Sequence, residues 1–146
     1  MTMADTVHKL QAELAPLTLT KFAETEAFRL GQILVDLAMT DQMPVVIDIR
    51  TADRTLFHAS LPGSAPLNDI WARRKSNTAL RFHEASLIVA LRNRALDETL
   101  DRHGLNPTDY AESGGAVPIR VKGVGVVAVA TVSGLPEVDD HALVLE

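Results

Sequence analysis

The sequence predicts an α+β fold in which one antiparallel sheet is flanked by helices. The predicted elements follow the order helix, hairpin, helices, hairpin, helix, and hairpins between helices favour an antiparallel sheet over a Rossmann fold. The chain has 146 residues, which suffices for one domain and hardly for two. A domain of this size buries enough of its surface to sustain a core, so we expect a single domain without disulfides.

Helices open the predicted order. Thr6 to Leu14 can form a short helix, which Pro16 interrupts. A longer helix is expected from Thr20, which we assign as its N-cap because Glu24 and Glu26 follow in the early turns. Apolar side chains repeat at helical spacing along it and define its buried face: Ala23, Ala27, Leu30, Ile33, Leu34, Leu37 and Ala38.

A hairpin and two helices come next. The β-branched run at 45–49 suits a strand, the "TADRT" segment suits a turn, and "TLFHAS" suits the returning strand. Proline and glycine punctuate the following loop, so a helix is expected after Pro66 or Asn68. A second helix is predicted from Glu84 to about His103, where Gly104 ends it.

A second hairpin and a last helix complete the order. Ala116 to Val121 suits one strand. Val124 to Val132 is nearly all apolar, which indicates a strand that is covered on both faces. Pro136 suits the first turn of the last helix, and three acids then complement its dipole: Glu137, Asp139 and Asp140.

Composition excludes several classes of function. The net charge is −5, with 19 acids against 14 bases, and this balance argues against nucleic acid as a partner. The longest apolar run is too short to cross a membrane as a helix, and the N-terminus lacks the apolar region of a signal peptide. The absence of cysteine fits a cytoplasmic location and rules out thiolate metal sites. The five histidines show no ligand spacing, so no metal site is predicted.

The segment "WARRKSNTALRF" contains the first candidate for a functional site. Arg74 and Lys75 fall on the helical face that Trp71 and Phe82 bracket. An arginine fork and a lysine ammonium can bind an anionic ligand. The same two cations could instead be solvated, if only the two ends of the helix pack, or could pair with carboxylates in a subunit interface. All three alternatives stay open at this point.

The C-terminal segment "VSGLPEVDDHALV" contains the second candidate. Ser133 ends a buried strand, and Asp140 precedes His141, whose imidazole a neighbouring carboxylate could orient or ionise. Taken alone, the local pattern favours a simpler interpretation, in which Asp140 complements the helix dipole and His141 lies at the surface. His58 is a third candidate, because its strand leads through a short loop into the helix that carries the two cations.

Three segments together resemble a known family. "PVVIDIR", "LFHASLPGSAPLNDIWARRKSNTALRF" and "YAESGGAVPIRVKGVGVVAVATVSGLPEVDDHALV" occur in this order and cover most of the chain after Thr20. They resemble the uncharacterised protein family UPF0303, which is grouped with HbpS-like and GlcG-like proteins in the superfamily of haem-degrading domains. The resemblance implies homo-oligomers and a profilin-like or PAS-like arrangement of sheet and helices. We expect an N-terminal helical extension at residues 1–19 and an HbpS-like/UPF0303 domain at residues 20–146.

Haem is the cofactor that the resemblance implies, since haem binding and haem breakdown are ascribed to HbpS-like relatives. A haem site needs an axial donor, and three histidines are candidates: His58, His83 and His141. A pocket is expected between the two candidate segments, where six side chains would contact a small anionic ligand: Asn68, Trp71, Arg74, Lys75, Ser133 and His141.

Three functions remain open from the sequence. The first is a cytoplasmic, homo-oligomeric domain that binds a small anionic ligand, either haem or another anion. The second is an enzyme that acts on haem or on a small carboxylate, with His141 as the acid–base residue. The third is an assembly or adaptor module without pocket chemistry, in which Arg74 and Lys75 form salt bridges between subunits.

Overall fold

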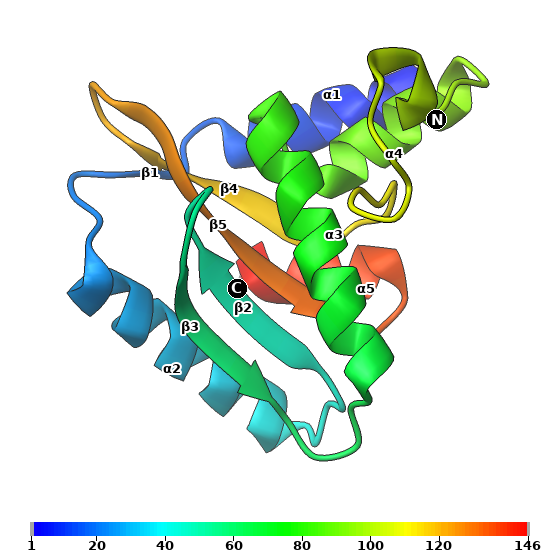
Figure 1. Ribbon diagram of the computed structural model, residues 1–146. Helices are drawn as coiled ribbons and strands as arrows, with labels where there is room; N and C mark the ends of the chain where they lie inside the picture. Colours follow the sequence, from blue (N-terminus) through cyan, green and yellow to red (C-terminus); the bar gives the residue numbers. More distant parts are fainter. Residues whose placement is uncertain (1, 146) are drawn as a thin grey trace.

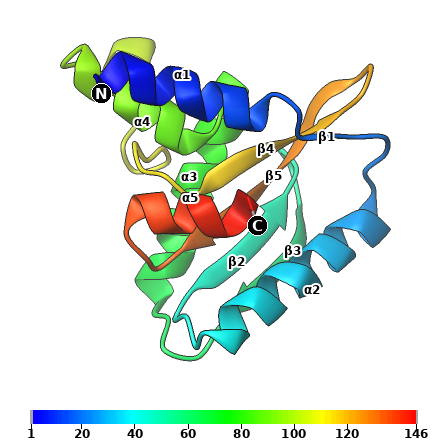
Figure 2. The ribbon, with the colours of Figure 1, turned by 180° about the vertical axis from the view of Figure 1, so that it is seen from behind.

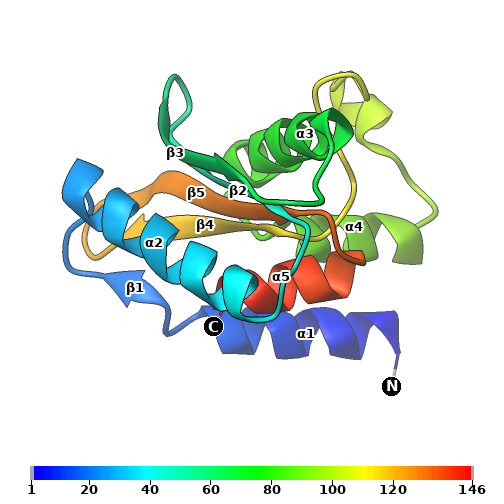
Figure 3. The same cartoon turned by 90° about the horizontal axis from the view of Figure 1, so that it is seen from below.

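Helices cover both faces of a central sheet in the computed structural model, which describes residues 2–145 (Figures 1 and 3). The helix α3 crosses one face, while α2 and α5 lie on the other (Figure 2). In chain order the elements are α1 (Met3–Leu14), β1 (Thr18–Leu19), α2 (Glu24–Thr40), β2 (Val46–Arg50), β3 (Thr55–Ser60), α3 (Pro66–Phe82), α4 (Ser86–Ala95), a 3₁₀ helix (Leu100–His103), β4 (Ala116–Val121), β5 (Gly125–Ser133) and α5 (Glu137–Leu145).

The strands form one sheet in the order β1-β4-β5-β2-β3. Both predicted hairpins are present, since β2 pairs antiparallel with β3 and β4 pairs antiparallel with β5. The two hairpins join where β2 runs antiparallel to β5. The predicted α+β class is therefore confirmed, with one correction. The short strand β1 pairs with β4 in parallel, so the sheet is mixed.

The buried face of α2 follows the predicted helical period, and its fully buried members are Ala27, Gly31, Leu34 and Ala38. Ile33 lies outside this face and is 54% exposed. The predicted N-cap at Thr20 is wrong, because the helix begins at Glu24 and Ala23 is the N-cap. Ala23 has no capping side chain, and its backbone N–H instead donates to Oε1 of Glu26 at 3.0 Å.

The face of α3 that packs on the sheet consists of small and polar side chains: Ala72, Lys75, Ser76 and Ala79. Ser76 continues this polar character into the sheet, because its Oγ lies 2.7 Å from Oγ1 of Thr131 in β5. Trp71 and Phe82 are only half-buried. The face of α3 that packs on the sheet is therefore rotated away from the predicted face between Trp71 and Phe82. The small side chains on the packed face allow the helix to lie close to the strands.

The helix predicted from Glu84 to His103 is wrong in its second half. Helix α4 ends at Ala95, and Asp97 has a φ of +51°, which a continuous right-handed helix does not contain. A 3₁₀ helix follows, and Gly104 ends it in the left-handed region as expected.

Burial on both faces of β5 confirms the prediction made from its apolar run for the second part of the run, whereas Val124 precedes the strand and is 70% exposed. Every residue from Ala128 to Ser133 is buried. One face packs with α2 and α5 in an apolar cluster that includes Leu34, Val132 and Leu143. The other face meets α3. Within residues 2–145, none of the helices has the length and the apolar character needed to cross a membrane.

Candidate functional site

Lys75 lies in the interior of the domain and forms an ion pair within the chain. Its Nζ donates to Oδ2 of Asp140 at 3.0 Å, and also to the backbone oxygens of Val132 at 2.7 Å and Gly114 at 3.0 Å. The two ionised side chains are 3% and 2% exposed. All three donors of the ammonium group are therefore occupied inside the protein.

Burial acts on both partners of this ion pair. It lowers the pKa of Lys75 and raises the pKa of Asp140, while the attraction between the two charges opposes both changes. Asp140 also accepts from the backbone N–H of Leu135 at 2.9 Å. Gly115 lies against the pair, because a Cβ built there would come within 2.5 Å of Nζ of Lys75. A residue without a side chain is thus needed where the lysine passes.

Arg74 lies apart from Lys75, which corrects the expectation that the two cations share one face. Its guanidinium stacks over the ring of Trp71, 4.4 Å from the ring centroid, and Nη2 donates to the backbone oxygen of Tyr110 at 3.4 Å. Asn68 ends up as a cap, since its Oδ1 accepts from the backbone N–H of Ala65 at 2.8 Å. Ligand binding by these residues stays a prediction.

His141 is 3% exposed, so its expected place at the surface is wrong. Both ring nitrogens are buried without a hydrogen-bond partner among the described residues. Burial lowers the pKa of His141, although the nearby charge of Glu13 opposes the shift, and the ring is therefore neutral at pH 7. Ser133 is also buried, at 2% exposure, and lies next to the carbonyl that Lys75 contacts.

His58 stands at the centre of a chain of charged groups on the face of the sheet that α3 crosses. Its Nδ1 lies 2.6 Å from Oδ2 of Asp48, and its Nε2 lies 2.7 Å from Oδ1 of Asp69. Arg50 donates two bonds to Asp48, at 2.6 and 2.7 Å, and Ser60 donates to Asp69 at 2.7 Å. The hairpin places these groups together, because Asp48 and His58 are register partners of β2 and β3.

The exposures within this group differ sharply. Asp48 is fully buried, whereas the side chain of His58 is 33% exposed and that of Asp69 is 35% exposed. Burial alone would lower the pKa of His58, but hydrogen bonds and attraction to the two carboxylates outweigh it and raise the pKa. The arrangement favours the protonated form of His58 between an interior carboxylate and a surface carboxylate, and the ring can release that proton and take it up again.

The raised pKa of His58 predicts a pH dependence of stability. The imidazolium contribution is fully present below the pKa of the unfolded chain and is lost as the pH rises through the higher folded pKa. We expect the difference in unfolding free energy between the wild type and His58→Gln to shrink as the pH rises above the ordinary pKa of histidine. Urea unfolding at several pH values measures it, and a constant difference would contradict the ion-pair assignment.

Other predicted positions lie elsewhere. His83 ends α3 in the left-handed region with an exposed side chain. A cavity of about 290 Å³ lies between α1 and β4, and none of the six predicted ligand contacts lines it. Among residues 2–145, no group of three or more His, Cys, Asp or Glu side chains could hold a metal ion.

Sequence reasoning missed Asp48 and Asp69. It assigned Asp140 to the N-terminal turn of the last helix but did not predict its buried ion pair with Lys75. A signal for Asp48 was present, because it interrupts the apolar strand "VVIDIR" and a buried carboxylate must be paired. Its neighbour Arg50 lies two residues along, on the same face of the strand. Asp69 gave no comparable signal, since an acid in the first turn of a helix is ordinary.

Comparisons with known proteins agree with this fold. The family model described as "Haem degrading protein HbpS-like" matches residues 22–146. A UPF0303 protein of Streptomyces coelicolor is 46% identical over 144 residues, which are 98% of this chain and 91% of that protein. The crystal structure of the Ybr137w protein matches with a TM-score of 0.86 and 30% identity, over 95% of this chain and 83% of that one.

A more distant solved structure shares the fold. The crystal structure described as a PduOC:haem complex matches with a TM-score of 0.69 and 20% identity, over 84% of this chain and 89% of that one. The resemblance drawn from the sequence is thereby confirmed. The chain belongs to the family of HbpS-like haem degrading proteins and is similar along its whole length to UPF0303 proteins.

Proposed function

We propose that this protein is a homo-oligomeric domain that binds haem, with His58 as the axial donor. One observation carries the proposal: the buried carboxylate of Asp48 holds Nδ1 of His58 at 2.6 Å, while the ring remains one-third exposed. Histidines that bind metals characteristically donate their second ring N–H to such a carboxylate. The family description, and the haem complex of a protein with the same fold, support haem as the ligand.

The described residues fit a haem in several respects. His58 combines exposure with a fixed ring, whereas His141 is buried and His83 has no carboxylate partner among residues 2–145. Leu67 and Ile70 are 61% and 49% exposed on α3, the helix that also supplies Asp69, and they offer apolar surface to a macrocycle. Bound haem would supply iron redox chemistry, while His58 would supply the ligand nitrogen.

Binding through Nε2 requires Asp69 to release that nitrogen. It also requires neutral His58, so haem affinity should rise as the pH passes through the raised pKa. Four of the predicted contacts lie on the same helix as Asp69, and we keep the three that are not buried in the proposed site: Asn68, Trp71 and Arg74. Lys75, Ser133 and His141 are buried, and in this proposal they support the fold around the site.

A titration of the purified protein with haemin, followed through the Soret band, tests the proposal. We expect a saturable, shifted band in the wild type and its loss in His58→Ala. Asp48→Asn should weaken affinity by about 10- to 100-fold, because the ring loses its fixed orientation. His83→Ala is the matched control, as it removes an exposed histidine outside the network. An unchanged band in His58→Ala, or a band lost only in His141→Ala, would contradict the assignment.

An enzyme is the second candidate function, and the contacts of His58 favour it over His141 as the acid–base residue. Its Nε2 faces Asp69 and lies 3.4 Å from Oγ of Ser60, at the surface where a haem or a small carboxylate could approach. Turnover that disappears in His58→Ala, with binding retained, would identify this role. Turnover lost in His141→Ala alone would restore the assignment made from the sequence.

The assembly module without pocket chemistry has less support. Lys75 uses its donors within the chain, so it is not available for a salt bridge between subunits. We place the proposed function in the cytoplasm, which the absence of cysteine supports.

A further inference from the structure

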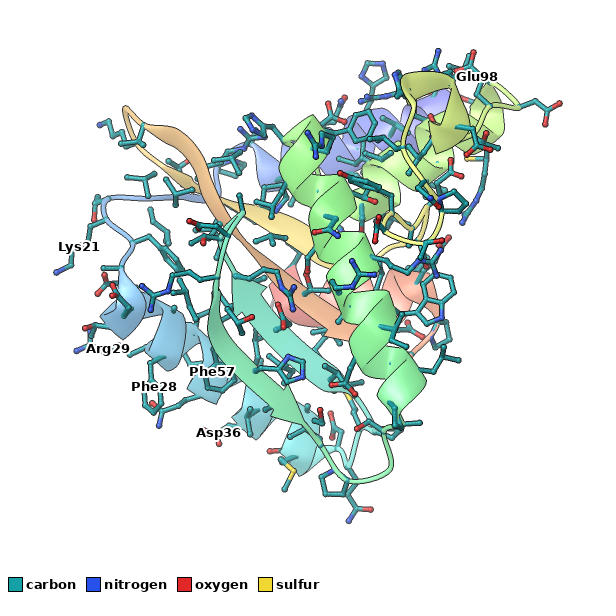
Figure 4. The ribbon with its side chains drawn as sticks, in the orientation of Figure 1. Lys21, Phe28, Arg29, Asp36, Phe57 and Glu98 are labelled. Carbon is teal, nitrogen blue, oxygen red and sulfur yellow. The ribbon has the colours of Figure 1, made fainter. Side chains whose placement is uncertain are left out.

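The outer face of α2 and the adjoining side of β3 form an apolar surface with two isolated charges. Phe28 and Ile33 are each 54% exposed, and the ring of Phe57 reaches this surface from β3 (Figure 4). A groove of about 520 Å³ runs here, lined by Arg29, Gln32, Ile33, Val35, Asp36 and Phe57. We call these residues together with Phe28 the α2 face. Large apolar side chains that are exposed together mark an interaction surface.

The α2 face is built on rigid packing. Phe57 lies against Gly31, where a Cβ would come within 2.5 Å of the ring, so the strand and the helix touch directly. Phe28 packs edge-on against Phe57, with ring centroids 6.1 Å apart. The strand β3 is also the edge of the sheet, where backbone groups are open to a neighbour. This surface is therefore preformed for a partner.

Arg29 and Asp36 identify that partner. They lie seven residues apart, two turns along the helix, and so point in nearly the same direction, about 10 Å from one another. At this separation they cannot pair within the helix, and neither has an ion-pair partner among residues 2–145. A surface with one cation and one anion is complementary to an inverted copy of itself.

We infer that a second copy of this chain docks on the α2 face, with the two α2 helices antiparallel around a two-fold axis. The axis passes between Gln32 and Ile33, midway between the two charges. Arg29 of each copy then faces Asp36 of the other, and the contact contains two identical ion pairs. Ile33 lies between these pairs and Phe28 lies just beyond Arg29, and association removes both apolar side chains from water. The α2 face is thus the contact surface of the homo-oligomer in the proposed function, and this contact does not require haem.

Charge reversal tests the geometry. Arg29→Glu places a carboxylate opposite Asp36 of the other copy, and Asp36→Lys places an ammonium opposite Arg29, so each single variant sets like charges together twice. We expect each to weaken self-association by about tenfold or more in sedimentation velocity. An equimolar mixture of the two variants should restore association. In the mixed dimer the introduced carboxylate faces the introduced ammonium, and the native Asp36 of one variant faces the native Arg29 of the other, so both charge pairs are attractive. A mixture that associates no better than the single variants would contradict the antiparallel pairing.

Matched controls separate the possible failures. Lys9→Glu changes the charge by the same amount on exposed α1 and should leave association unchanged. Circular dichroism of each variant should match the wild type, since both charges lie outside the core. An oligomeric wild type whose assembly resists both reversals would overturn the α2 face alone. A wild type that is monomeric at all concentrations would overturn the homo-oligomer itself, and neither result bears on the haemin titration.

Discussion

Replacing Asp140 with alanine is expected to lower the free energy of unfolding by about 3–5 kcal/mol, because it leaves the ammonium of Lys75 buried without its counter-charge. The side chain of Lys75 cannot reach water from its place between α3, the sheet and α5, since it is 3% exposed. Urea unfolding followed by fluorescence measures the change, and Trp71, the single tryptophan, provides the signal.

Two further variants make this prediction specific. Asp139→Ala removes the neighbouring exposed acid of the same helix and should change stability by less than about 0.5 kcal/mol. The double variant Lys75→Met/Asp140→Leu should recover part of the loss, because an apolar pair needs no counter-charge, although the backbone groups that the ion pair contacts lose their partners. If Asp140→Ala unfolds at the same urea concentration as the wild type, the ion pair is not a stabilising contact.

Gly115→Ala is expected to cause the second large loss of stability. Gly115 has a φ of +136°, a conformation that costs an alanine about 1–3 kcal/mol. The added Cβ would also press on the backbone oxygen of Val132 and on Nζ of Lys75, which adds an overpacking cost of about 1–3 kcal/mol. Gly115→Ala therefore pushes apart Nζ of Lys75 and the backbone oxygen of Val132, whose hydrogen bond holds the lysine side chain in place.

Gly104 supplies the comparison for this prediction. It also has a positive φ, of +76°, but a Cβ there meets no atom within 4 Å. Gly104→Ala should therefore lose only the conformational part, about 1 kcal/mol. Equal losses for the two alanine variants in urea unfolding would mean that the passage beside Gly115 has more room than the structure shows.

The fold could be predicted where the spacing of apolar residues fits only one type of secondary structure. The apolar run of β5 and the stripe of α2 gave the correct elements, because each is buried through that pattern. The boundaries of α4 could not be predicted in this way. The break at Asp97 depends on one residue in the left-handed region, and the helical composition continues past it.

The site could be predicted only in part. His58 was a candidate from the sequence, yet its partners Asp48 and Asp69 lie on two other elements, which only the fold brings to it. Lys75 was also identified, but with the wrong environment. A lysine between polar neighbours resembles a surface residue, and nothing local shows that Asp140 lies on the other side of the sheet to receive it.

The path of Lys75 has a consequence for how the molecule folds. It leaves α3 on one side of the sheet and meets α5 on the other, joining residues that are 65 positions apart in the chain. Contacts with such long loops form late, after the intervening strands are paired. The ion pair between Lys75 and Asp140 is therefore expected to form after the transition state for folding. Weakening it should leave the folding rate nearly unchanged and should increase the unfolding rate.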